Sequence, residues 1–105
     1  MAQIIWTEPA LSDLNAIAEY IALDKPDAAR SLVKHVFSSV DNLELFPELG
    51  RTPPELKLSK YREIIVDPCR IFYRIDQGKV YILHVMRGEM RLRRYLINER
   101  AKNNG

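Results

Sequence analysis

The feature that most limits the fold is the run from Tyr61 to Tyr95, which reads YREIIVDPCRIFYRIDQGKVYILHVMRGEMRLRRY. Three stretches rich in apolar and aromatic residues, 61–66, 69–76 and 79–87, are each short enough to be strands. Gln77-Gly78 has the composition of a two-residue hairpin turn, and Asp67-Pro68 marks a second turn. The run therefore predicts a meander of three strands, in which arginines are interspersed among apolar residues.

Two amphipathic helices are expected before the meander. The first should run from its N-cap, Thr7, to about Leu23, because apolar residues recur there at helical spacing. The second should run from about Pro26 to Phe46, where Pro47 stops it. Their connection is short, so we expect the two helices to form an antiparallel hairpin.

The remaining segments complete a single domain, 1–105. A short strand is expected at Gln3–Thr7, a loop at Pro47–Lys60, a basic helix at Glu89–Glu99 and a frayed end from Ala101 to Gly105. The order is β-α-α-β-β-β-α. It predicts an α+β fold with the helical hairpin packed on a small, mostly antiparallel sheet, and with a short C-terminal helix.

Composition and charge narrow the class of protein. The chain has 105 residues, of which 47% are hydrophobic and 29% charged, and this permits one modest core. Its formal charge of +2 does not by itself indicate nucleic-acid binding, although basic residues gather in the last quarter. Cys69 is the only cysteine, the first residues lack a signal-peptide pattern, and no segment is apolar enough to span a membrane. We expect a cytoplasmic protein without metal or cofactor.

Alternation along the strands assigns side chains to two faces of the sheet. With Gln77-Gly78 as the turn, Phe72 is expected opposite Leu83 and Arg70 opposite Val85. The face under the helical hairpin would be nearly uncharged and would hold Ile71, Tyr73, Ile75, Val80, Ile82, His84 and Met86. The other face would mix arginines with apolar residues: Arg70, Phe72, Arg74, Tyr81, Leu83, Val85 and Arg87. The strand at 61–66 would add either Arg62 or Glu63 to it.

Two arginines dominate this second face. Arg70 and Arg87 are expected to be diagonal neighbours, and two close guanidinium groups suit a bridging phosphate or carboxylate. Because a charge within a meander is costly without a partner or a purpose, we expect Arg70 to be functional. His84 is expected to be a structural histidine in the core. The C-terminal helix should dock on this face, with Met90, Leu96 and Ile97 covering Leu83 and Val85.

The sequence resembles the RelE/ParE superfamily of bacterial toxins from type II toxin–antitoxin modules. The resemblance covers nearly the full length and is carried by IIWTEPALSDLNAIAEYIA, FPELGR, YREIIVDPCRIFYRI and ILHVMRGEMRLRRYL. It implies a helical hairpin on a small antiparallel sheet. It also implies a growth-inhibiting toxin of the plasmid-stabilization kind, which a cognate antitoxin wraps and neutralises in a hetero-oligomer.

The resemblance leaves two targets open. ParE-like members bind DNA gyrase, whereas RelE-like members cut mRNA on the ribosome with the RNA 2′-OH as nucleophile and without a metal. As a ribonuclease, the chain would use Arg70, Arg87, Tyr95, Arg62 and, as proton acceptor, Glu55. The strand at 61–66 lacks the lysine pair of some ribosome-dependent members, and the VMRGEM segment is closer to ParE-like members.

The ParE-like branch is therefore favoured, and enzymatic activity is left open. A further alternative is a degenerate member that binds an antitoxin without being toxic. In each case the surface expected to bind the target or the antitoxin comprises Arg70, Phe72, Arg74, Tyr81, Leu83, Val85, Arg87, Arg91 and Arg94.

Overall fold

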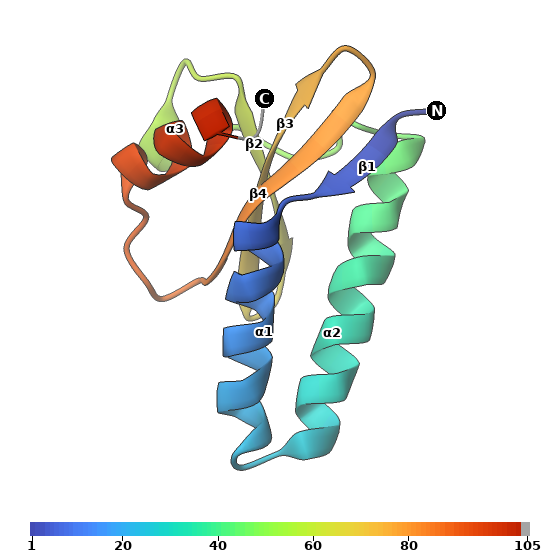
Figure 1. Ribbon diagram of the computed structural model, residues 1–105, viewed down its shortest axis with the longest axis vertical. Coiled ribbons are helices and arrows are strands. Elements are labelled where there is room, and N and C mark those ends of the chain that lie inside the picture. The colour runs from blue at the N-terminus through green and yellow to red at the C-terminus, as the bar shows by residue number, and fades with distance from the viewer. Residues whose placement is uncertain (104–105) are drawn as a thin grey trace.

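A computed structural model describes residues 1–103 and contains one four-stranded sheet with helices on both faces (Figure 1). The elements are β1 (Gln3–Trp6), α1 (Glu8–Ala22), α2 (Pro26–Asp41), β2 (Tyr61–Val66), β3 (Cys69–Asp76), β4 (Lys79–Arg87) and α3 (Arg94–Asn103), with short 3₁₀ turns η1 (Asn42–Glu44) and η2 (Pro54–Leu56). The predicted α+β class and order of elements are confirmed. In this part of the chain, no helix combines the length and apolar character needed to cross a membrane.

The first helix begins where its N-cap predicts. The Thr7 hydroxyl accepts a hydrogen bond from the backbone N–H of Ala10 and donates one to the carbonyl of Ile82 in β4, at 2.7 Å. Thr7 therefore fixes the start of α1 on the sheet. The second helix ends at Asp41, so the predicted end at Phe46 is wrong. The tighter turn of η1 ends it early, and this turn keeps Leu43 fully buried.

The three strands of the meander have the predicted bounds. Gln77 and Gly78 both adopt positive φ angles, 49° and 75°, which a two-residue hairpin turn of type I′ requires. The strand order is β1-β4-β3-β2, in which β1 is parallel to β4 and the other two pairings are antiparallel. The prediction of a mostly antiparallel sheet is confirmed.

The predicted register between β3 and β4 is wrong beyond the middle of the strands. It holds from Asp76↔Lys79 to Tyr73↔Ile82, and then shifts by one residue so that Phe72 lies opposite His84 and Arg70 opposite Met86. Leu83 is the extra residue of a β-bulge. Because side chains alternate, a bulge reverses the facing of every later residue in the strand relative to the prediction.

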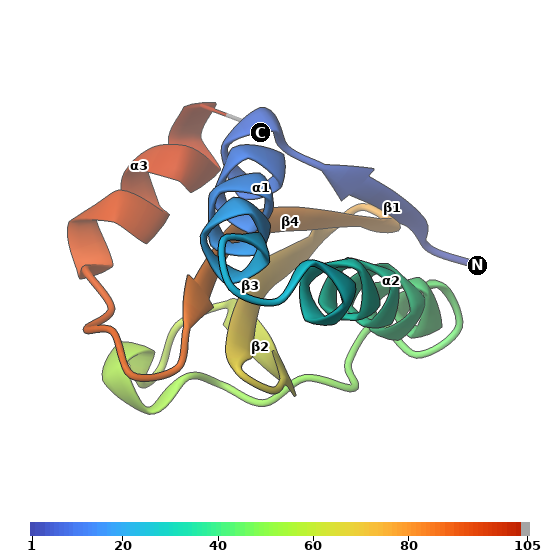
Figure 2. The same ribbon diagram turned by 90° about the horizontal axis from the view of Figure 1, so that it is seen from below.

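The sheet separates two hydrophobic cores, and because of the bulge these cores contain different residues of β4 from those predicted. The core under α1 and α2 includes Ile71, Tyr73, Val80, Ile82 and Val85. The core under α3 includes Leu56, Tyr61, Phe72, Leu83, Met86, Leu92, Ile97 and Ala101. Val85 and Met86 have exchanged faces. Figure 2 shows α1 and α2 side by side, with α3 on the other side of α1 from α2.

The C-terminal helix docks on the second face as predicted, but it begins later. It spans Arg94–Asn103 instead of Glu89–Glu99, because residues 88–93 form a loop whose Gly88 N–H donates to the carbonyl of Pro68. Ile97 covers the sheet, whereas Met90 is exposed. The expected fraying is wrong for residues 101–103, since Ala101 is buried in the core; residues 104 and 105 lie outside the described residues.

Gly50 is predicted to be the glycine least able to accept a side chain. A Cβ there would lie 2.6 Å from both the Glu63 carbonyl and the Tyr73 hydroxyl, and that hydroxyl accepts a hydrogen bond from Gly50 N–H. We expect Gly50→Ala to lower the free energy of unfolding by about 1–3 kcal/mol, as overpacking does. The measurement is urea denaturation. Gly88→Ala is the control, because its nearest contact is an ordinary 3.5 Å; equal losses in both variants would contradict the prediction.

Candidate functional site

Arg70 lies near the start of β3 and is paired with two carboxylates of its own chain. Its Nε and Nη2 donate to the two oxygens of Glu63, at 2.6 and 3.1 Å. Its Nη1 and Nη2 donate to the two oxygens of Glu55, each at 2.7 Å. The side chain is only 11% exposed. The charge that the sequence marked as costly is thus balanced inside the molecule.

Neighbouring elements hold both carboxylates in place. Glu63 projects from β2 with a completely buried side chain, and it also accepts a hydrogen bond from Arg51 Nε at 3.0 Å. Glu55 belongs to η2, which Leu56 anchors in the core under α3. Arg51, Glu55, Glu63 and Arg70 form what we call the Arg70 cluster, with two positive and two negative charges.

The hydrogen bonds of the Arg70 cluster determine the protonation of Glu55. The hydrogen bonds that Arg70 donates to Glu55 lower the pKa of Glu55 to about 2. The same bonds, together with those that Glu63 accepts, raise the pKa of Arg70. A carboxylate with so low a pKa is a poor proton acceptor at neutral pH. In this conformation Glu55 therefore serves as the charged hydrogen-bond partner of Arg70.

The other residues proposed for a ribonuclease do not join this pair. Arg62 points to the opposite face of the sheet, where it donates to the carbonyls of Glu48 and Gly50. Arg87 also lies on that face, because the bulge places it opposite Cys69. The predicted convergence of Arg70 and Arg87 is wrong for this reason. Tyr95 is 63% exposed on α3.

Most of the predicted docking face is covered. Phe72 and Leu83 are fully buried under α3, and Arg74 is buried with its guanidinium over the ring of Tyr81, at 4.6 Å. Arg94 lies at the exposed start of α3. Among the predicted docking residues, Val85, Arg87 and Arg91 come together elsewhere, in a groove that the sequence did not reveal.

This groove lies between α1, the end of β4 and the segment leading into α3, and has a volume of about 630 Å³. Its apolar lining includes Ile17, Val85, Met86, Met90 and Leu96, and its basic lining consists of Arg87, Arg91 and Arg93. We call it the arginine groove. Arg87 packs over the exposed ring of Tyr20, 5.4 Å from its centroid, and its Nε lies 2.6 Å from Glu89.

Asp13 lines the arginine groove and joins three elements. Its Oδ2 lies 2.8 Å from His84 Nδ1 and accepts hydrogen bonds from Val85 N–H at 3.0 Å and Arg100 Nη1 at 2.6 Å. Burial would raise the pKa of Asp13, but hydrogen bonds with His84, Arg100 and Val85 hold it below its usual value. His84 is buried and stacks on Phe72, at 5.7 Å. The carboxylate thereby ties α3 to α1 and β4.

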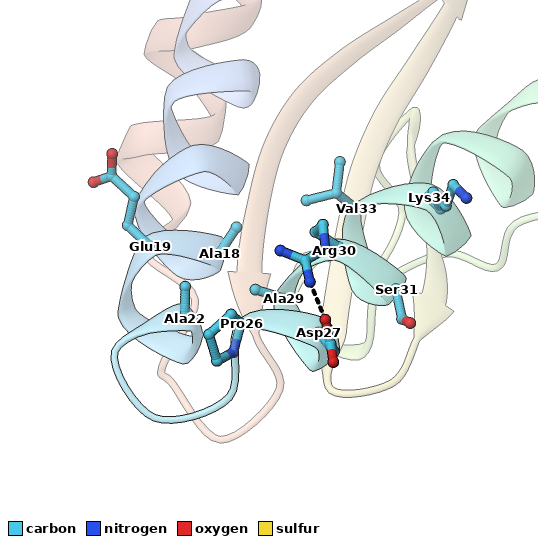
Figure 3. Close-up of a pocket in the computed structure, with 10 residues that line it drawn as sticks. All are labelled: Ala18, Glu19, Ala22, Pro26, Asp27, Ala29, Arg30, Ser31, Val33 and Lys34. Carbon is cyan, nitrogen blue, oxygen red and sulfur yellow. Dashed lines mark hydrogen bonds and ion pairs between the residues drawn. The ribbon is translucent and has the colours of Figure 1, made fainter.

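A second cavity, of about 740 Å³, lies at the end of the helical hairpin where the turn joins α1 to α2 (Figure 3). Ala18, Ala22 and Ala29 are among the residues that line it. Figure 3 shows Glu19 and Lys34 pointing in different directions, and the interaction drawn there joins Asp27 to Arg30. Because its polar groups do not converge, this cavity is a weaker candidate site than the arginine groove.

The sequence is similar to known toxins over most of its length. The family described as the ParE toxin of the type II toxin–antitoxin system parDE matches residues 4–92. Toxin RelE2 of Caulobacter vibrioides is 37% identical over 86 residues, covering 81% of this chain and 93% of that protein. Toxin ParE3 of the same organism is 28% identical over 93 residues, covering 88% and 92%.

A solved structure has the same fold. The chromosomal ParDE toxin–antitoxin system from P. aeruginosa contains a chain with a TM-score of 0.73 and 24% identity, which covers 85% of this chain and 98% of its own length. The family match ends at Leu92 and so leaves out α3, which begins at Arg94. Of the elements that line the arginine groove, α1 and β4 lie within the match, whereas Arg93 and Leu96 lie beyond it.

Removal of Arg70 is predicted to destabilise the fold. Arg70→Ala leaves the buried carboxylate of Glu63 without its main partner, and breaking a buried pair in this way costs about 3–5 kcal/mol. Urea denaturation measures the loss. Arg30→Ala is the control, because Arg30 pairs with Asp27 on the exposed surface, where such a pair contributes less than about 1 kcal/mol. Similar stability of both variants would show that the Arg70 cluster does not hold the fold.

Proposed function

This chain belongs to the ParE toxin family of type II toxin–antitoxin systems, and from that membership we propose that it inhibits growth by binding DNA gyrase. We propose in addition that a cognate antitoxin neutralises it in a hetero-oligomer. The toxin class is given by the family, and the target is inferred. A cytoplasmic location would follow from that target.

The observation that carries this proposal is the internal pairing of Arg70. Stabilising a phosphate in a transition state requires donors aimed at the developing charge. Each of the three guanidinium nitrogens of Arg70 instead donates to Glu55, Glu63 or both. The pKa of Glu55, about 2, does not suit a general base. A toxin that acts by binding needs neither group.

We propose the arginine groove as the docking site of the antitoxin. An apolar floor beside Arg87, Arg91 and Arg93 suits an amphipathic helix that carries acidic residues beside its apolar stripe. Tyr20 and Arg87 stack at the rim, and tyrosine and arginine are the residue types that dominate binding energy at interfaces. The groove therefore offers both apolar anchoring and charge complementarity.

A ribosome-dependent ribonuclease is the second candidate. It is favoured by the 37% identity to a protein named as a RelE toxin. In that case Arg70 would have to leave Glu55 when RNA binds, so that its Nη1 and Nη2 edge could face a phosphate. The gyrase proposal requires no such rearrangement.

Two assays on the purified chain separate these functions. We expect it to inhibit supercoiling of plasmid DNA by gyrase, and to leave a reporter mRNA intact in a translating extract. Toxin mixed beforehand with its antitoxin is the control for both assays. Normal supercoiling at saturating toxin, together with a cleaved mRNA, would replace the gyrase proposal by the ribonuclease. Inactivity in both assays would favour a member that binds the antitoxin without being toxic.

A charge reversal in the arginine groove is predicted to weaken antitoxin binding. The double variant Arg91→Glu, Arg93→Glu should raise the Kd for the antitoxin at least about tenfold, which corresponds to roughly 1.4 kcal/mol. Isothermal titration calorimetry provides the measurement. Arg30→Glu carries the same type of change on the exposed hairpin and should bind as the unmodified chain does. If the groove variant keeps full affinity, the antitoxin docks elsewhere.

A further inference from the structure

Arg74 is a buried arginine with one edge of its guanidinium unpaired. Its side chain is 3% exposed, and its Nη1 lies 3.3 Å from Asp76. Its Nε and Nη2 are buried and have no hydrogen-bond partner among residues 1–103. Buried donors are normally satisfied, so this pair of nitrogens calls for a ligand.

The two unpaired nitrogens form one geometric unit. Nε–H and the adjacent Nη2–H of an arginine point in the same direction and match the two oxygens of a carboxylate or a phosphate. Arg70 shows the pairing within this protein, because the same edge of its guanidinium donates to both oxygens of Glu63. Arg70 and Arg74 are four residues apart in β3 and therefore share a face. Asp76 lies beside Nη1 of Arg74, but the edge formed by Nε and Nη2 has no carboxylate partner among residues 1–103.

The surroundings of Arg74 suit an anion. Tyr61 of β2 and Tyr81 of β4 lie opposite Arg74 on the two neighbouring strands, and the Tyr81 ring stacks on the guanidinium. The Tyr61 hydroxyl donates to Asn98 of α3, at 3.1 Å, so α3 passes beside this site. Lys102 lies one helical turn after Asn98 and adds a second positive charge on the same face of α3.

We propose that Arg74 anchors an oxyanion-binding site at the seam between the sheet and α3, and that the site takes a carboxylate or a phosphate group through Nε and Nη2. Both nitrogens are buried, so an anion reaches them only when the side chains around them move. The site lies on the opposite face of the sheet from Val85 and Arg87 of the arginine groove. It does not depend on gyrase being the target.

Thermal unfolding of the full chain in phosphate, acetate or chloride, at one pH and ionic strength, tests the proposal. An anion that binds only the folded state raises Tm, by roughly 5 °C at about ten times its Kd. We expect this rise, relative to chloride, in the unmodified chain and in Arg30→Lys. We expect no rise in Arg74→Lys, which keeps the charge but loses the two-nitrogen edge. The anion that gives the larger difference identifies the preferred group.

The comparison with Arg74→Lys also controls for the general stabilising effect of phosphate on folded proteins, because that effect acts equally on both chains. Equal rises in Arg74→Lys and in the unmodified chain, or no rise in either, would overturn the proposal. If Arg74→Lys does not fold, the test is an NMR titration of the unmodified chain that follows the Nε–H resonance of Arg74. A saturable shift of that resonance with the anion, absent with chloride, supports the site, and an unchanged resonance overturns it.

Discussion

The bulge at Leu83 is the constraint on which the arrangement of charged groups depends. One extra residue in β4 moves Val85 into the core under the helical hairpin, Met86 under α3, and Arg87 beside Tyr20 of α1. Without the bulge, Arg87 would share a face with Arg70. With the bulge, Arg70 lies on the face of the sheet under α3, and Arg87 of the arginine groove lies on the opposite face.

The sequence predicted those parts of the fold that local chemistry determines. Gln77-Gly78 supplies the positive φ angles of the hairpin turn, and Thr7 caps α1, so the strand bounds and the start of α1 were correct. The register and the start of α3 depend on contacts between distant segments. Nothing in the residues around Leu83 marks a bulge. The segment 88–93 is held as a loop partly by a hydrogen bond from Gly88 to Pro68. A pattern of apolar residues contains neither fact.

The candidate site was predictable only in part, because it too depends on contacts between segments that are distant in the sequence. The sequence shows that a charge in the middle of β3 is costly, but it does not show whether the compensating group comes from the same chain. The sequence predicts Glu63 only as an alternative to Arg62 on the arginine-bearing face, and Glu55 only as a proton acceptor. Both are structural partners of Arg70. The arginine groove was missed because Asp13, Ile17 and Tyr20 of α1 are far in sequence from the arginines that they approach.

The carboxylate of Asp13 has a consequence for ligand binding at a distance. It fixes Arg100 of α3 to α1 and β4, while α3 borders the arginine groove through Leu96 and the Arg74 seam through Asn98. A molecule in the groove that shifts α3 would therefore also shift Asn98, beside the proposed anion site. If that shift changes the affinity for the anion, thermodynamic reciprocity requires that the anion change the affinity of the groove by the same factor. One helix would then couple sites on the two faces of this small sheet.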